Sequence, residues 1–273
     1  MNMKFPEFLK KNGTIGFVAP SFGCNIEPYK TSFNHALEKF HDMGYHTELG
    51  PNCYEGSGIG ISNTPKNCAE ELNDMYVSEK NDALISCGGG ELMCEILDNV
   101  DFDAIKAAKP KWYMGYSDNT NFTFLLTTIC DVASIYGPCA GTFGMEPWDE
   151  SIEDSFSLFT GKKLTMQSYP LWEKEGLRDE EHPLEPYNLT EQSLVRGFLT
   201  QKDQMGEVQA FETEGTIEFK GRLIGGCMDC LVNLTGTKFD QVKSFNERYK
   251  EDGIIWYLES CDLNVFGIRR AIW

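Results

Sequence analysis

Ser117 has the sequence neighbours that an activated serine nucleophile needs. It lies between the apolar run 112–114, which is typical of the end of a β-strand, and the polar run 118–121, which is typical of a helix start. A serine on such a turn exposes its hydroxyl at the edge of a sheet, and the unpaired N–H groups of the helix start can stabilise a developing anion. An ordinary helix cap has the same composition, so both interpretations stay open on these residues alone.

A run of three glycines follows another strand-type segment. Residues 83–86 are apolar and β-forming, and residues 88–90 are all glycine. Glycine allows sharp backbone turns that present N–H groups to an anion. The Gly-Lys-Ser/Thr of a phosphate-binding loop and the spacing of a dinucleotide fingerprint are both absent. We therefore expect an oxyanion hole built from one N–H of this run and the N–H of Asp118, with a plain tight turn as the alternative.

The acid and the base of a serine hydrolase are less evident. Glu259 follows the β-type run 254–258, and it is either a solvated strand end or the acid that orients a histidine. Serine needs such a base at neutral pH. No histidine follows Glu259, so His182, in an acidic loop segment, is left as a substitute base. The other histidines are expected on the surface or in packing, at His35, His41 and His46.

The order of the predicted elements places these residues together. Strand-type and helix-type runs alternate over residues 1–150, which indicates an α/β domain with a doubly wound, mainly parallel, Rossmann-like sheet. Ligands bind at the carboxyl ends of such strands, where both Ser117 and the glycine run lie. Residues 151–190 are expected to be a linker. Residues 191–273 hold shorter runs and one helix at 228–234, which predicts a mainly β second domain.

Composition excludes several classes of function. The 273 residues carry a formal net charge of −18, which argues against binding to nucleic acid or to an anionic membrane. The chain has no signal peptide and no run of the roughly 20 apolar residues that span a membrane, so we expect a cytoplasmic protein. Its ten cysteines are then expected to be free thiols. The CxxC at 227–230 has no second pair, so core packing is expected there and no metal site.

Six motifs occur in order along the chain, at residues 83–90, 101–105, 115–118, 135–138, 221–226 and 257–259. With these motifs the chain resembles the LD-carboxypeptidase family of serine peptidases, peptidase family S66. Within that family it is most similar to the branch that includes the microcin C immunity peptidases. The resemblance spans nearly the whole chain, and several motifs in order are more specific than any one alone.

The resemblance implies a Ser–Glu–His triad with Ser117 as nucleophile and Glu259 as the acid. It also implies an oxyanion hole formed by the backbone N–H groups of Gly90 and Asp118. The expected reaction is that of a serine carboxypeptidase, which cleaves a peptide or amide bond near a C-terminus. The expected substrate is a murein tetrapeptide or a peptidyl-nucleotide antibiotic. The resemblance implies no metal or cofactor, and a homodimer.

The histidine of the family lies beyond its glutamate, whereas this chain ends 14 residues after Glu259. The spacing of Val265, Ile268, Ile272 and Trp273 predicts a terminal helix that lacks a C-cap. We therefore expect an incomplete second domain, and a chain that is inactive as it stands because its triad histidine is missing. The alternative is a non-catalytic protein that keeps the fold and binds a peptide or a nucleotide-like ligand. The sequence identifies no substrate-binding residue.

Overall fold

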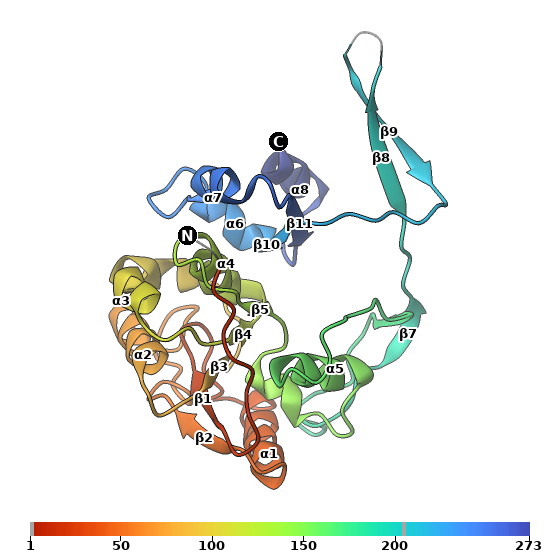
Figure 1. The fold of residues 1–273 in the computed structure, drawn as a ribbon. Helices are drawn as coiled ribbons and strands as arrows, with labels where there is room; N and C mark the ends of the chain where they lie inside the picture. The colour runs from red at the N-terminus through yellow and green to blue at the C-terminus, as the bar shows by residue number, and fades with distance from the viewer. Residues whose placement is uncertain (1–2, 204–205) are drawn as a thin grey trace.

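The centre of the molecule is a five-stranded parallel sheet (Figure 1). The computed structural model describes residues 3–203 and 206–273. The strand order is β2-β1-β3-β4-β5, and every neighbouring pair is parallel. The predicted α/β fold with a doubly wound sheet is therefore confirmed. The strands are β1 (Thr14–Val18), β2 (His46–Leu49), β3 (Ala83–Ser86), β4 (Tyr113–Gly115) and β5 (Ile135–Tyr136).

Apolar residues alternate along the strands and so divide the core between the two faces of the sheet. On β4, Met114 belongs to one apolar cluster and Tyr113 to the other. The first cluster includes side chains of α1 (Tyr29–Asp42), η3 (Ala140–Gly144) and α5 (Glu150–Phe159). The second cluster includes side chains of α2 (Pro65–Val77), η1 (Met93–Asn99), α3 (Phe102–Ala107) and α4 (Thr120–Thr128).

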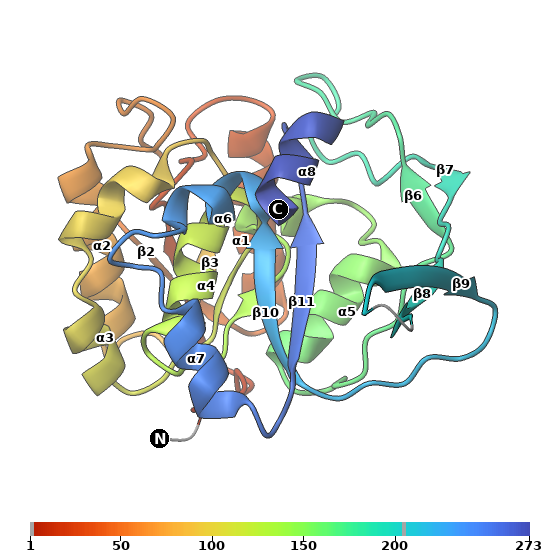
Figure 2. The same cartoon turned by 90° about the horizontal axis from the view of Figure 1, so that it is seen from above.

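The C-terminal part of the chain packs on the central sheet through α4. Strands β10 (Arg222–Cys227) and β11 (Ile254–Glu259) form a parallel pair, and they lie side by side in Figure 2. A third apolar cluster joins Phe124 and Leu125 of α4 to Ile224 of β10 and Phe245 of α7. The helices of this part are α6 (Met228–Leu234), α7 (Val242–Tyr249) and α8 (Val265–Ile272). The predicted helix at 228–234 is confirmed as α6.

Two antiparallel pairs connect these parts. Strand β6 (Leu171–Glu173) pairs with β7 (Leu189–Gln192), and β8 (Gly197–Lys202) pairs with β9 (Val208–Thr213). The β8–β9 hairpin projects away from the remainder of the molecule in Figure 1. Strands β8 to β11 lie in the smaller, mainly β region that the sequence predicts at residues 191–273. Strand β6 and nearly all of helix α5 lie within residues 151–190, where a linker was expected. No helix among the described residues combines the length and the apolar character that crossing a membrane requires.

Candidate active site

Ser117 lies on a tight turn between β4 and α4, as its sequence neighbours predict. Its φ angle is 59°, a left-handed conformation that costs a non-glycine residue about 1–3 kcal/mol. Glycine at position 115 permits the turn, because a Cβ there would lie 2.8 Å from Cγ of Asn119. We call residues 115–119 the serine turn. Ser117 is partly exposed, so its hydroxyl can meet a substrate.

Residues 88–90, the glycine loop, face the serine turn from the end of β3. A Cβ on Gly89 would lie 3.1 Å from Cβ and 3.3 Å from Oγ of Ser117, so a side chain there would require the serine to shift. The two segments are tied together, since the Asn119 side-chain amide donates a hydrogen bond to the Gly88 carbonyl at 3.0 Å. The loop therefore lies directly against the candidate nucleophile.

Two N–H groups are available beside the serine. Within the described chain, neither the Gly90 N–H nor the Asp118 N–H donates a hydrogen bond to another group. The N–H of Ser117 is different, because it donates to the hydroxyl of Tyr136 at 2.8 Å. An oxyanion bound here would meet Gly90 and Asp118, the pair that the resemblance implies, and this assignment stays a prediction.

A cleft of about 630 Å³ opens beside the serine turn. The glycine loop, Ser117 and Arg178 line it. The Arg178 guanidinium packs against the ring of Tyr29, 5.4 Å from its centroid, and no carboxylate of the described residues lies within ion-pair distance of it. The cleft therefore combines a serine, the free N–H group of Gly90 and an unpaired cation. The sequence did not single out Arg178, which lies in a segment without a recognisable motif.

Glu259 lies at the exposed end of β11, as predicted, and reaches the serine turn through one intermediate. The hydroxyl of Tyr136 donates a hydrogen bond to Oε1 of Glu259 at 2.5 Å. Burial and the neighbouring Glu259 raise the pKa of Tyr136, so the phenol keeps its proton and acts as donor. The β11 strand is in turn held near α4, because the Cys227 N–H on its partner strand β10 donates to Oγ1 of Thr120 at 2.9 Å.

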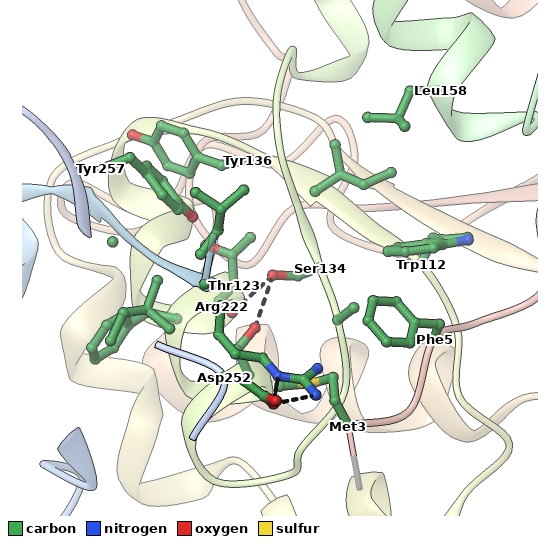
Figure 3. Close-up of a pocket in the computed structure, with 18 of the residues that line it drawn as sticks. Met3, Phe5, Trp112, Thr123, Ser134, Tyr136, Leu158, Arg222, Asp252 and Tyr257 are labelled. Atoms are coloured by element: carbon green, nitrogen blue, oxygen red, sulfur yellow. Dashed lines mark hydrogen bonds and ion pairs between the residues drawn. The ribbon is translucent and has the colours of Figure 1, made fainter. Parts of the chain in front are cut away.

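Tyr136 also forms one wall of a second, larger cavity of about 800 Å³ (Figure 3). Tyr136 and Tyr257 lie together at one end of this cavity, with ring centroids 5.6 Å apart, and Phe5 and Trp112 lie at the other end. Its lining is mostly apolar and includes no residue of the glycine loop. The cleft, and not this larger cavity, is therefore the candidate substrate site.

None of the four histidines, all of them in the described part of the chain, makes a hydrogen bond to Ser117 or Glu259. Nδ1 of His35 lies 2.7 Å from the Gly144 carbonyl oxygen, and Nδ1 of His182 lies 3.0 Å from Oδ1 of Asp179. His41 and His46 are exposed on α1 and β2. The structure thus brings Ser117, Gly90, Asp118 and Glu259 into one neighbourhood and leaves His182 in an exposed loop.

Comparison with known proteins identifies related sequences and folds. Residues 15–137 match the family model of the LD-carboxypeptidase N-terminal domain, peptidase S66. The microcin C7 self-immunity protein MccF of Escherichia coli is 29% identical over 229 residues, which are 83% of this chain and 62% of that protein. The chain therefore spans about three fifths of the length of this curated relative.

Solved structures share the whole fold. A structure of MccF in an inactive mutant apo state has a TM-score of 0.76 at 23% identity, covering 97% of this chain and 73% of that one. An MccF-like protein from Streptococcus pneumoniae in complex with AMP has a TM-score of 0.68 at 16% identity, covering 95% and 76%. The comparisons support the family that the ordered motifs predicted: residues 15–137 match the N-terminal domain of peptidase family S66, and the chain is similar to a microcin C immunity protein.

Proposed function

We propose that this chain carries the nucleophile, the acid and the oxyanion hole of a serine hydrolase of the LD-carboxypeptidase type. The observation that supports this most directly is the left-handed Ser117, with φ of 59°, facing a glycine loop beside the free N–H groups of Gly90 and Asp118. A strained serine between a strand and a helix is the geometry of a nucleophile turn. A helix cap alone requires neither the strain nor the adjacent loop.

In the proposed reaction, Oγ of Ser117 attacks the scissile carbonyl and its proton passes to a base. The carbonyl oxygen becomes an oxyanion that the N–H groups of Gly90 and Asp118 stabilise. The amine leaves with a proton, and water then hydrolyses the acyl-enzyme. The base is a histidine that Glu259 orients. We place it in a part of the protein outside these 273 residues, because the four histidines here contact neither Ser117 nor Glu259.

The proposed substrate is an aminoacyl or peptidyl nucleotide with a cleavable amide bond. One solved relative is MccF in complex with aspartyl sulfamoyl adenosine. In this chain the unpaired guanidinium of Arg178 in the cleft suits a substrate with an anionic group. A murein tetrapeptide also carries an anionic group, its terminal carboxylate, and is the second substrate to test.

The test is a hydrolysis assay on the natural gene product that contains this chain. It compares an aminoacyl sulfamoyl adenosine with a murein tetrapeptide, in the wild type and in Ser117→Ala. We expect Ser117→Ala to lower turnover by roughly 10³-fold or more. Ser168→Ala, at an exposed serine in a loop, is the matched control. Turnover that survives in Ser117→Ala would overturn the proposal.

A non-catalytic binding function is the second candidate, and it is favoured by the lack of any histidine contact to Ser117. A serine-directed phosphonate separates the two candidates. Labelling of the gene product at Ser117 supports the hydrolase. Absence of labelling, together with calorimetric binding of the aminoacyl sulfamoyl adenosine, supports the binding protein.

A further inference from the structure

We propose that the buried side chain of Asp118 is a positioning residue that holds Gly90 in place as the second half of the oxyanion hole. This inference rests on the proposed function. The backbone N–H of Asp118 donates to no group among the described residues, whereas its carboxylate accepts hydrogen bonds and the residue is only 2% exposed. The same residue would thus donate one N–H to the oxyanion and fix the position of the other.

The carboxylate of Asp118 gathers contacts from distant parts of the chain. Its Oδ2 accepts hydrogen bonds from Oγ of Ser21 at 2.5 Å and from the Met93 N–H at 2.9 Å. Its Oδ1 accepts a hydrogen bond from the side-chain amide of Asn121 at 3.0 Å, and the Cys230 thiol lies 3.8 Å away. The two Oδ2 donors lie 97 and 25 residues away in the sequence.

One of these donors packs against Gly90, and the other follows it closely in the sequence. A Cβ on Gly90 would lie only 2.3 Å from Oγ of Ser21, so that hydroxyl packs directly against the backbone of the loop. Met93 begins η1, three residues after Gly90. One carboxylate oxygen therefore holds both the hydroxyl that packs against Gly90 and the N–H of Met93, three residues after the glycine that would donate the second oxyanion hydrogen bond.

A local capping role does not account for this arrangement. An aspartate in the first turn of a helix ordinarily accepts a hydrogen bond from a backbone N–H of its own helix. Neither η2 (Ser117–Asn119) nor α4 has a side-chain cap. No cation of the described residues lies within ion-pair distance of Asp118, although burying an unpaired carboxylate is costly. The two hydrogen bonds of its Oδ2 come instead from Ser21 and Met93, outside the serine turn and α4.

The first variants to test are Asp118→Ala and Ser21→Ala in the gene product. We expect each to lower kcat, and the rate of phosphonate labelling at Ser117, by roughly 10- to 100-fold with KM changed less than about twofold. The double variant should lose little more kcat than Asp118→Ala alone, because both changes remove the hydrogen bond between Ser21 and Asp118. Ser32→Ala is the matched control, since it removes a buried hydroxyl whose hydrogen bond to Pro183 lies outside this network.

Asp118→Asn separates positioning from charge. Its amide oxygen can still accept from Ser21 and Met93. The NH₂ of the new asparagine would lie beside the side chain of Asn121. The Oδ1 of Asn121 is buried without a partner, and it would accept a hydrogen bond from this NH₂ after the Asn121 amide rotates by half a turn. We expect kcat of Asp118→Asn within about threefold of wild type. If Asp118→Ala does not fold, the kcat values of Ser21→Ala and Asp118→Asn are compared with that of the wild type instead.

Two results would overturn the inference. One is wild-type kcat in folded Ser21→Ala and Asp118→Ala while Ser117→Ala is inactive, which leaves the proposed function standing. The other is an Asp118→Asn variant, folded and as slow as Asp118→Ala, which would assign the effect to charge. Turnover that survives in Ser117→Ala would instead remove the proposed function itself.

Discussion

The hydroxyl of Tyr136 donates a hydrogen bond to the carboxylate of Glu259 at 2.5 Å, across 123 residues of sequence. The same hydroxyl accepts a hydrogen bond from the Ser117 N–H at 2.8 Å. The backbone N–H of Ser117 is therefore engaged and does not face an oxyanion. Oε2 of Glu259 has no hydrogen-bond partner among the described residues and stays open to a further donor.

Tyr136→Phe should lower both activity and stability. The Ser117 N–H would lose its acceptor and Glu259 its donor, so we expect kcat to fall by roughly 10- to 100-fold and the free energy of unfolding to fall by about 1–3 kcal/mol. Steady-state hydrolysis and urea unfolding measure the two effects. Tyr257→Phe, on the adjacent ring, is the control, because its hydroxyl makes no hydrogen bond among the described residues. Equal effects of the two variants would contradict the bridging role of Tyr136.

Glu259→Gln should lower kcat by roughly 10²- to 10⁴-fold, because an amide cannot stabilise a histidinium. The amide oxygen still accepts the hydrogen bond from Tyr136, so we expect an unchanged unfolding midpoint. The pH profile of kcat/KM, compared with that of Glu251→Gln on the turn before the same strand, measures the effect. Full activity of Glu259→Gln would remove Glu259 from the triad.

Gly89→Ala should impair catalysis more than stability. The added methyl group would lie 3.1 Å from Cβ and 3.3 Å from Oγ of Ser117, and the serine must shift to admit it. We expect kcat to fall by roughly 10- to 100-fold, because small displacements of a reacting group are costly. Gly215→Ala, whose nearest neighbour lies at 3.4 Å, is the control. A kcat that is unchanged in both would show that Ser117 does not react from this position.

Arg178→Gln should weaken binding of an anionic substrate, with KM raised about tenfold and kcat little changed. The wild-type KM should rise with added salt, and the KM of the variant should respond less. Arg196→Gln is the control, since its guanidinium pairs with Glu212 at 2.7 Å beside the β8–β9 hairpin. A KM that is equal in wild type and Arg178→Gln would exclude Arg178 from substrate binding.

Glu71 should make the stability of the protein depend on pH. Burial raises the pKa of this carboxyl from 4.5 to about 7, although the N–H groups of Asn52 and Ala19 donate to it and lower the pKa. Between these values the folded state binds more protons than the unfolded state, so the free energy of unfolding falls as pH rises from about 4.5 to 7. The shift corresponds to about 3 kcal/mol.

Urea unfolding at pH 5 and pH 8 measures this dependence. The side chain of Glu71→Gln cannot titrate. The part of the difference in free energy of unfolding between pH 5 and pH 8 that Glu71 causes should therefore disappear. Glu70→Gln, at the exposed neighbouring position on α2, should retain it. A pH dependence that is the same in all three proteins would show that Glu71 titrates normally.

The central sheet and the serine turn could be predicted because their signals are local. The apolar runs that become β1, β3 and β4 are short and end in glycine or polar residues, and a strand-to-helix serine is recognisable within five residues. The helix α7 was not predicted. Its only buried side chains are Phe245 and Tyr249, four residues apart within a polar segment, and they are buried because α4 and β10 lie beneath them.

The contacts of Tyr136 and Ser21 could not be predicted for a different reason. Tyr136 lies in the motif at residues 135–138, but tyrosine and serine are common at strand ends, and their immediate neighbours do not show which distant group either hydroxyl contacts. Their roles appear only when residues 97 and 123 positions apart meet at the serine turn. Arg178 likewise lies in a segment without periodicity. Contacts made by single polar side chains over such separations leave no pattern along the chain.

The parallel pairing of β10 with β11 has a consequence for how the protein is made. Translation delivers the serine turn and the glycine loop long before Glu259, the last residue of β11. Domains generally fold as units during synthesis, N-terminal first, so the sheet that presents Ser117 can form on the ribosome while Glu259, the proposed acid, is still missing. Under the proposed mechanism the nascent chain would then hold a serine without its proton relay, and hydrolysis would begin only once Glu259 and the histidine that it orients are both in place.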